Sequence, residues 1–348
     1  MHKALHPHSP WRIFAVSALA TVGSIIGVLV GKGFEAMLLA TVLIAVELAF
    51  SFDNAIVNAK ILKQMSSFWQ IMFLTIGAAI AIFGMRLIFP VLLVVLTAGL
   101  SWGEVISLAL NHPLEYAHKL ESAHVVLSAF GGGFLLMLAL HFFFDGERKV
   151  LWYARLERPL QRFAYKWMPA FVALSVIAVT AAVPFNHESQ DTLVAGTIGV
   201  LTYSIVHAAS EYFARVQKRK AGIGLRVGMA GFISFMYLEV LDASFSFDGV
   251  LGAFAVTKDV VLIAIGLGVG ALWVRSLTIF MVRRGTLDSY KYIEHGAHYT
   301  IGILAGILIL SIFIHIPEVI AGLVGVGIIG SSIVASRQAL RAHRRADA

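Results

Sequence analysis

Apolar stretches long enough to cross a bilayer recur along the whole chain. A spanning helix needs roughly 20 mostly apolar residues, and ten stretches of the 348-residue sequence meet this requirement. They are 11–30, 34–60, 68–98, 121–144, 168–185, 191–214, 225–254, 259–282, 295–315 and 317–337. Only 14% of the residues are charged, whereas a soluble domain carries about 25%. The sequence therefore predicts an all-α, polytopic membrane protein of about ten transmembrane helices, with residues 1–348 forming a single membrane domain.

Lysine and arginine residues indicate how these helices are oriented. If the ten helices alternate and both termini are cytoplasmic, 22 of the 27 basic residues fall on the cytoplasmic side. Lys32, Lys119 and Lys258 fall outside, and Arg86 and Arg275 fall within helices. Cytoplasmic loops of membrane proteins are enriched in basic residues. The net charge of +7 is therefore a topology signal, and a nucleic-acid partner is not needed to explain it.

An acidic motif occurs twice within the apolar stretches. The octet around Asp53, Ala-Phe-Ser-Phe-Asp-Asn-Ala-Ile, recurs around Asp248 as Ser-Phe-Ser-Phe-Asp-Gly-Val-Leu. Each copy has a carboxylate six residues earlier, Glu47 in the first and Asp242 in the second. Carboxylates at membrane depth are costly and usually pair, bind a ligand or line a watery path. A duplicated acidic motif is typical of transporters with a site between two repeats.

Two further matches extend the repeat. Arg86 has a partner in Arg275, and Glu121-Ser-Ala-His124 resembles Glu294-His-Gly-Ala-His298. Three matches in the same order predict a repeated three-helix unit. The predicted parts are repeat one at 34–144, linker helices at 145–224, repeat two at 225–315, and a last helix with a basic cytoplasmic tail at 316–348. Five helices separate the starts of the two units, so the predicted repeats are inverted.

The two motifs together predict a cation site near the membrane midplane. Its predicted oxygen ligands are Glu47, Asp53, Asn54, Glu239, Asp242 and Asp248, with Asn58 beside them. Arg86 and Arg275 balance two of the five negative charges. The chain contains no cysteine, and hard divalent cations such as Mn²⁺, Ca²⁺ or Mg²⁺ suit an all-oxygen set. The alternative is that the acids pair with the arginines and only fix helix packing.

The spacing within each motif sets a condition on this site. Asp242 and Asp248 are six residues apart, which is about 240° around an ideal helix. Both could reach one ion only if the helix unwinds between them, which the intervening serines and Gly249 would permit. The same condition holds for Glu47 and Asp53.

These motifs resemble those of the TerC family of integral membrane proteins. The resemblance covers roughly residues 34–335 and rests on Glu47–Ala55, Glu239–Gly249 and the arginine-containing stretch 259–282. It is closest to an uncharacterised TerC-like branch that shares Glu294-His-Gly-Ala-His298 and His315-Ile-Pro-Glu318. TerC was named for tellurium resistance and is linked to the lysine-exporter superfamily. The resemblance implies a multi-pass protein of the bacterial inner membrane and, for several relatives, manganese export.

A second group of metal-ligand residues lies around the start of the fourth apolar stretch. The residues Glu115, His118, Glu121 and His124 recur every three positions. If 113–125 is helical, they form a carboxylate and imidazole stripe that could gather divalent ions on the outer side. The alternative is a solvated amphipathic connection.

Three functional classes remain to be compared. The sequence favours a secondary transporter that exports a divalent metal ion, manganese first, by alternating access. The alternative is a non-transporting membrane scaffold or stress-response protein that holds a structural ion. An enzyme is not expected, because there is no His-Glu-x-x-His motif and no intramembrane nucleophile beside a base. The expected partners are the metal ion and the lipid bilayer, and a homodimer is left open.

Overall fold

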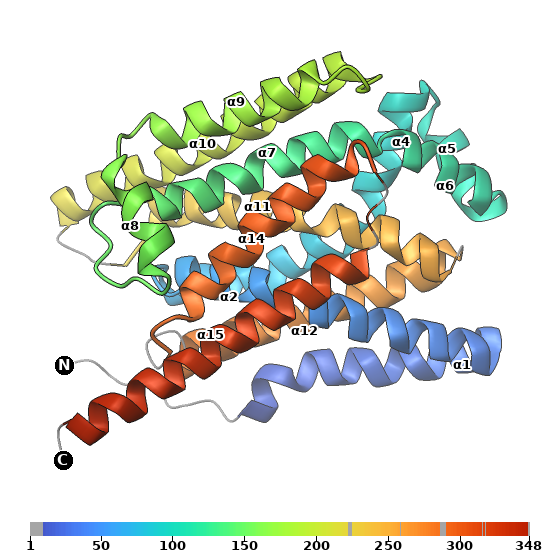
Figure 1. Ribbon diagram of the computed structural model, residues 1–348. Coiled ribbons are helices and arrows are strands. Elements are labelled where there is room, and N and C mark those ends of the chain that lie inside the picture. Colours follow the sequence, from blue (N-terminus) through green and yellow to red (C-terminus); the bar gives the residue numbers. More distant parts are fainter. Residues whose placement is uncertain are drawn as a thin grey trace. The chain divides into compact units, whose positions relative to one another are not determined.

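A computed structural model describes residues 10–221, 225–257, 259–285, 290–314, 316 and 318–346. Within these ranges the side chains at 10–12, 50, 93, 96, 97, 217–221, 245–248, 251, 252, 254, 255, 318, 319, 321 and 342–346 are outside the description. The described chain forms helices and no strand (Figure 1). The helices are α1 (Pro10–Phe50), α2 (Phe52–Leu62), α3 (Ser67–Met72), η1 (Phe73–Gly77), η2 (Ile80–Ile88), α4 (Phe89–Ala98), α5 (Trp102–Asn111), α6 (Pro113–Ser122), α7 (His124–Phe143), α8 (Ala154–Arg162), α9 (Met168–Ala182), α10 (Ser189–Ala221), α11 (Gly228–Val256), α12 (Val260–Arg284), α14 (Ile293–Ser311) and α15 (Glu318–Ala346).

Seven stretches within the described helices are long and apolar enough to cross a membrane. They are Ile13–Ala49, Ser67–Leu92, His124–Phe143, Ser189–Val216, Val260–Arg284, Ile293–Ser311 and Gly322–Arg341. By this length and composition, the predicted all-helical, multi-pass membrane protein is confirmed. Gly33, with φ 87°, interrupts α1 between the first two predicted spans. The count of ten helices stays a prediction.

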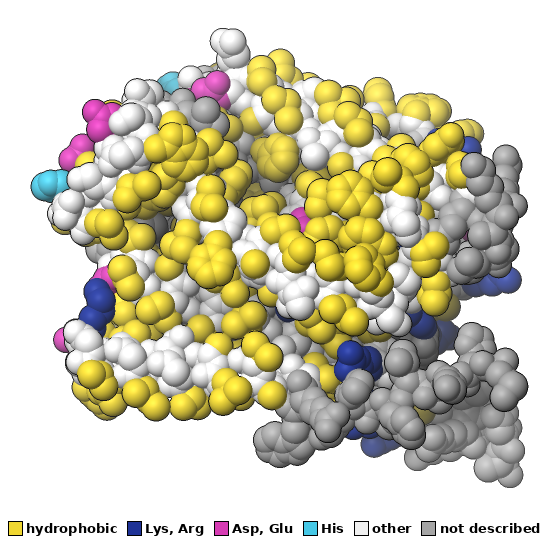
Figure 2. All heavy atoms as spheres, turned by 180° about the vertical axis from the view of Figure 1, so that it is seen from behind, with side chains coloured by type: hydrophobic (Ala, Val, Ile, Leu, Met, Phe, Trp, Pro, Cys, Tyr) yellow, Lys and Arg dark blue, Asp and Glu magenta, His cyan; other side chains and the backbone are white. Residues whose placement is uncertain are grey.

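The exterior of the protein is apolar, as a bilayer requires. Figure 2 shows hydrophobic side chains spread widely over the described part of one face, whereas the charged side chains lie mainly toward its edges. Along α1, large side chains such as Leu19, Val30 and Phe34 are exposed. A soluble monomer rarely leaves so continuous an apolar surface in water. Contact with lipid chains removes that cost, so these side chains are compatible with a membrane-spanning helix.

The chain divides into two compact units. The first unit contains Met1–Ser122 and Gly224–Leu287, and the second contains Ala123–Ile223 and Asp288–Ala348. The third helices of the two predicted repeats, α7 and α14, both belong to the second unit. The first two helices of each predicted repeat belong to the first unit. The repeat boundaries themselves stay a prediction.

In the first unit, α12 is packed against α1, α2 and η2. Polar contacts accompany the apolar packing, because Ser17 Oγ lies 2.8 Å from Ser276 Oγ and Trp273 donates to Thr21 Oγ1 at 2.8 Å. In the second unit, α7 packs against both α10 and α14. A Cβ atom at Gly199 of α10 would lie 2.1 Å from the Phe130 carbonyl oxygen of α7. This backbone approach requires glycine.

The third predicted span forms with a local change of helix type. The chain is helical from α3 to α4, but η1 and η2 have π-helical hydrogen bonding. Pro90 stands in the first turn of α4 and cannot donate to the carbonyl four residues earlier. Widened π turns are a common way to absorb such a defect, and they often occur at functional sites. η2 carries Arg86.

The connection between the third and fourth predicted spans is itself helical. The residues that follow the third predicted span fold into α5 and α6. Ser101 and Glu104 form a reciprocal capping box at the start of α5. Ser101 donates to Glu104 Oε2 from its backbone amide and from its hydroxyl, and these two hydrogen bonds lower the pKa of the exposed Glu104 carboxyl.

Candidate functional site

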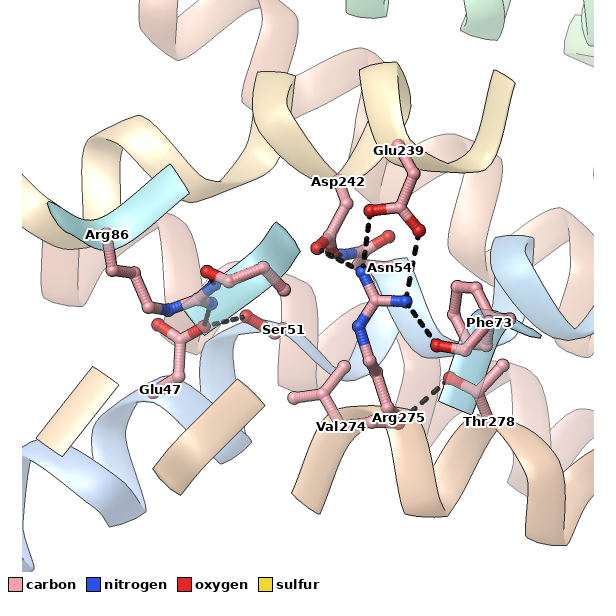
Figure 3. A network of polar contacts seen from close by, with 11 residues as sticks. Glu47, Ser51, Asn54, Phe73, Arg86, Glu239, Asp242, Val274, Arg275 and Thr278 are labelled. Carbon is pink, nitrogen blue, oxygen red and sulfur yellow. Dashed lines mark hydrogen bonds and ion pairs between the residues drawn. The ribbon is translucent and has the colours of Figure 1, made fainter. Parts of the chain in front are cut away.

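The buried charges of the first unit gather where α1, α2, η1, η2, α11 and α12 meet (Figure 3). The described side chains predicted for this site are Glu47, Asp53, Asn54, Arg86, Glu239, Asp242 and Arg275, and none is more than 7% exposed. They come from helices that are far apart in sequence. Burying this many charges is expensive unless they are paired.

Arg275 of α12 is the centre of one ion-pair network. Its Nη2 lies 3.1 Å from Glu239 Oε2 and 3.0 Å from Asp242 Oδ2. Its Nη1 donates to Glu239 Oε1 at 3.2 Å and to the Phe73 carbonyl oxygen at 2.9 Å. The guanidinium also lies 4.2 Å from the centre of the Phe73 ring. The two parallel contacts with Glu239 are the strong, geometrically specific form of an arginine–carboxylate pair.

Arg86 of η2 forms the second pair, with Glu47 of α1. The same guanidinium donates from Nη1 to the Ala81 carbonyl oxygen at 2.7 Å. Ser51, the residue between α1 and α2, donates from its Oγ to Glu47 Oε1 at 3.2 Å. Glu47 is therefore held by one cation and one hydroxyl group.

The two ion pairs occupy matching positions in the duplicated motifs. Glu47 aligns with Asp242 at an offset of 195 residues, and Arg86 aligns with Arg275 at an offset of 189. Each copy thus joins the acid of its first helix to the arginine of its second helix. Asn54 of the first copy donates from Nδ2 to Asp242 Oδ1 of the second at 2.8 Å. The second copy has the additional acid Glu239, so the network is not fully symmetric.

Within the described structure, an acid without an ion-pair partner and two amide oxygens without a hydrogen bond lie along α2. Asp53 is 3% exposed, and no described residue forms an ion pair with it. Oδ1 of Asn54 and Oδ1 of Asn58 are buried and accept no hydrogen bond within the described structure. Residues four apart share a helix face. Buried polar atoms usually have a hydrogen-bond partner. These two amide oxygens are therefore positions where a ligand or water would bind.

A glycine lets the two copies approach at this site. A Cβ atom at Gly77 of η1 would lie 2.5 Å from Arg275 Nη1 and 2.5 Å from Glu239 Oε1. A Cβ atom there would force one of these two side-chain ends to move, so glycine leaves room for the Arg275–Glu239 pair in its present geometry. The π-helical turn of η1 places the Phe73 carbonyl within reach of the same guanidinium.

The helix backbone between the two acids differs between the two motifs. The helix changes course at Ser51 between α1 and α2, with φ −92° and ψ 16°, although Ser51 N still donates to Glu47 O. In contrast, α11 is continuous from Gly228 to Val256, so the expected unwinding between Asp242 and Asp248 is wrong for this structure. A continuous helix satisfies its own backbone hydrogen bonds, so an unwound segment would need other partners for these groups. The Asp248 side chain lies outside the described residues.

The predicted outer stripe is divided between two helices. Glu115, His118 and Glu121 lie on α6, which ends at Ser122, and His124 begins α7 in the other unit. A single helix over 113–125 is therefore wrong. His118 Nδ1 and Glu121 Oε2 are 3.9 Å apart, with side chains 84% and 71% exposed. Among the described residues no three His, Asp or Glu side chains are close enough to hold a metal.

The sequence analysis missed a buried carboxylate in the second unit. Glu157 of α8 has no exposed surface, and its Oε2 lies 3.2 Å from Arg148 Nη2 and 3.4 Å from His295 Nε2. Tyr299 donates to its Oε1 at 3.2 Å. The available signal was that Glu157 is the one acid within the basic and aromatic stretch 148–167.

Comparison with known proteins identifies a family without a described activity. No curated protein and no solved structure matches the chain. A family model described as "Protein of unknown function (DUF475)" matches residues 52–344. That range covers every described residue of the site except Glu47 and Ser51. The match spans most of the sequence, and the chain belongs to the DUF475 family.

Proposed function

We propose that this protein is a secondary transporter of a divalent metal cation, with manganese first among the candidates. The cation is the transported substrate, and the buried polar site of the first unit is where it would bind. Export is the direction implied by the resemblance to TerC, which itself stays a prediction. The proposed location is a bacterial inner membrane, with both termini cytoplasmic.

One observation carries this proposal: negative charge and oxygen donors remain after the arginines are paired. Glu47, Asp53, Glu239 and Asp242 are buried, and among the described side chains of this site the cations are the two buried arginines Arg86 and Arg275. If all six groups are ionised, four carboxylates and two guanidinium groups leave a formal charge of −2. A divalent cation or protons would neutralise that charge.

The donor atoms suit a hard cation. Asp53 supplies a carboxylate, and Asn54 and Asn58 supply amide oxygens that accept no hydrogen bond in the described structure. Oxygen-only donor sets favour Mn²⁺, Ca²⁺ and Mg²⁺ over metals that prefer sulfur or imidazole. The absence of cysteine from the whole chain agrees with this preference.

The duplicated ion pairs support alternating access. In a transporter with inverted repeats, the two copies exchange conformations about a site between them. Here the pairs of Arg86 and Arg275 are equivalent by alignment, and the Asn54–Asp242 hydrogen bond joins the copies. An exchange could break one pair while the other forms. Carboxylates that lose a cation would take up protons, which makes proton antiport the natural coupling.

A scaffold with a structural ion is the second candidate, and one observation favours it. Arg275 binds two carboxylates and one carbonyl at the same time, which fixes α11, α12 and η1 together. Such a network resists movement. Ion binding without ion movement would identify this alternative.

Flux into liposomes tests the proposal. Purified protein is reconstituted, and uptake of Mn²⁺, Ca²⁺ and Mg²⁺ is followed with a trapped indicator dye. Asp53→Asn and its aligned counterpart Asp248→Asn should each abolish flux, because each removes a charged donor. Asp191→Asn removes an exposed carboxylate at the start of α10 and is the control. Unchanged flux in both site variants would refute the transport site, and binding without flux would establish the scaffold.

A further inference from the structure

A basic and aromatic segment of the second unit lies outside the proposed transport site. It consists of residues 154–167, which are α8 and the five residues that lead into α9, and is called the α8 segment. The segment contains four basic residues and the single acid Glu157. One face of the α8 segment is buried and hydrogen-bonded, and the other face is exposed and basic.

The inward face of α8 is fixed by hydrogen bonds. Glu157 accepts from the backbone amides of Trp152 at 3.2 Å and Tyr153 at 3.0 Å. One turn later, Gln161 Nε2 donates to the carbonyl oxygens of Asp145 at 3.1 Å and Arg148 at 3.0 Å. Residues 157 and 161 share a face. The helix is therefore held in one orientation, and its only acid is buried and paired with Arg148.

The outward face carries unneutralised positive charge. Arg155, Arg158 and Arg162 follow the i, i+3, i+7 spacing of one helical stripe, and all three are exposed. Lys166 is exposed as well. Because Glu157 is turned inward, no acid within the segment offsets this stripe. Asp145 and Glu147, in the preceding loop, are the nearest exposed acids in the sequence.

Aromatic side chains place this stripe at the level of lipid headgroups. Phe163, Tyr165 and Trp167 are between 54% and 59% exposed. They directly precede α9, an apolar helix whose Phe171 is 58% exposed. Exposed tyrosine and tryptophan at the end of an apolar helix mark the membrane–water interface. The arginine stripe lies one to three turns earlier in the chain, on the polar side of that boundary.

We propose that the α8 segment binds the headgroups of anionic phospholipids. The stripe of Arg155, Arg158 and Arg162 would contact lipid phosphates, and the aromatic residues would insert among the upper parts of the acyl chains. Charge complementarity selects the partner, since the exposed face has basic groups and no acid. The lipids bound would belong to one leaflet, the leaflet on the side of the membrane where the basic connections lie.

The test measures lipid binding to the full-length protein in detergent by native mass spectrometry. Phosphatidylglycerol and phosphatidylcholine of equal chain length are titrated separately. The triple variant R155Q/R158Q/R162Q should weaken phosphatidylglycerol binding on the order of a hundredfold and leave phosphatidylcholine binding unchanged. R155K/R158K/R162K keeps the charge and should retain most of the affinity. Arg158→Gln alone should cost roughly fivefold, which serves if the triple variant does not fold.

The matched control removes equal charge elsewhere. R283Q/R284Q/R341Q changes three exposed arginines of α12 and α15 and should leave phosphatidylglycerol binding intact. An equal loss in this control, or no loss in R155Q/R158Q/R162Q, would overturn the proposal. Glycerol phosphate without acyl chains should bind far more weakly than the lipid. Equal binding would show a free-phosphate site, which also overturns it.

Discussion

Replacing Arg275 by glutamine should destabilise the first unit more than any other single change in the candidate site. Arg275 is 2% exposed and is the described cation that faces both Glu239 and Asp242. Glutamine keeps part of the side-chain volume and can still donate a hydrogen bond, but it removes the charge. Two acids of α11 would then share a buried site without a cation.

The magnitude follows from those contacts. Breaking a buried ion pair by removing one partner costs about 3–5 kcal/mol, and Arg275 has two acidic partners together with the Phe73 carbonyl. We therefore expect a loss near the upper end, about 5 kcal/mol. Arg86→Gln leaves only Glu47 without its cation, and Ser51 still donates to that acid. Its cost should be nearer the lower end, about 3 kcal/mol.

The assay is equilibrium unfolding in mixed micelles, where increasing SDS replaces a mild detergent and tryptophan fluorescence reports the folded fraction. Arg283→Gln removes an exposed arginine from the same helix α12 and should cost less than about 0.5 kcal/mol. Adding Glu239→Gln to Arg275→Gln removes one of the two unpaired acids. The double variant should therefore be more stable than Arg275→Gln alone, with a coupling of roughly 1–3 kcal/mol.

Two results would refute this reasoning. An Arg275→Gln variant as stable as Arg283→Gln would mean that the network contributes nothing to folding. An Arg86→Gln variant that loses more stability than Arg275→Gln would mean that the number of buried acidic partners does not set the cost.

Three other changes test separate parts of the structure. Gly270→Val should impair folding of the first unit in a detergent melt, because even a Cβ atom there would lie 2.5 Å from Glu47 Cβ and Cγ. At Asp259, the N-cap of α12, burial raises the carboxyl pKa, but the Lys32 contact and two backbone amides together hold the pKa below its usual value of 3.8. This stabilisation should be complete above pH 3.8 and be lost as the pH falls further, so Asp259→Asn should flatten the acid limb of a melting curve against pH. Glu157→Gln should speed proteolysis between α7 and α8, because it removes the closest counter-ion of Arg148, whose side chain is 10% exposed; equal cleavage rates would contradict that role.

Much of the site was predictable because the sequence repeats. The alignment of Glu47 with Asp242 and of Arg86 with Arg275 needs only the order of short motifs. The buried state of these acids followed from the apolar stretches around them. The unwinding expected between Asp242 and Asp248 failed, because backbone continuity depends on hydrogen bonds that α11 retains.

The predicted outer stripe shows what residue spacing cannot predict, which is where a helix ends. A spacing of three residues predicts one helical face only while the helix continues, and α6 ends at Ser122. His124 therefore belongs to α7 and to another unit. Local spacing indicates a face, but a helix end between two residues separates them.

The sequence by itself determined the protein's class, because apolar length and scarce charge leave few alternatives to membrane-spanning helices. It also predicted which residues are equivalent in the two aligned motifs. Only the tertiary structure decided that Arg275 binds Glu239 as well as Asp242, and that Asn54 reaches Asp242 across 188 positions. It also decided that Glu157, within a basic segment, turns inward. Each of these contacts depends on which helices pack together, and side-chain periodicity along one helix carries no information about its neighbour.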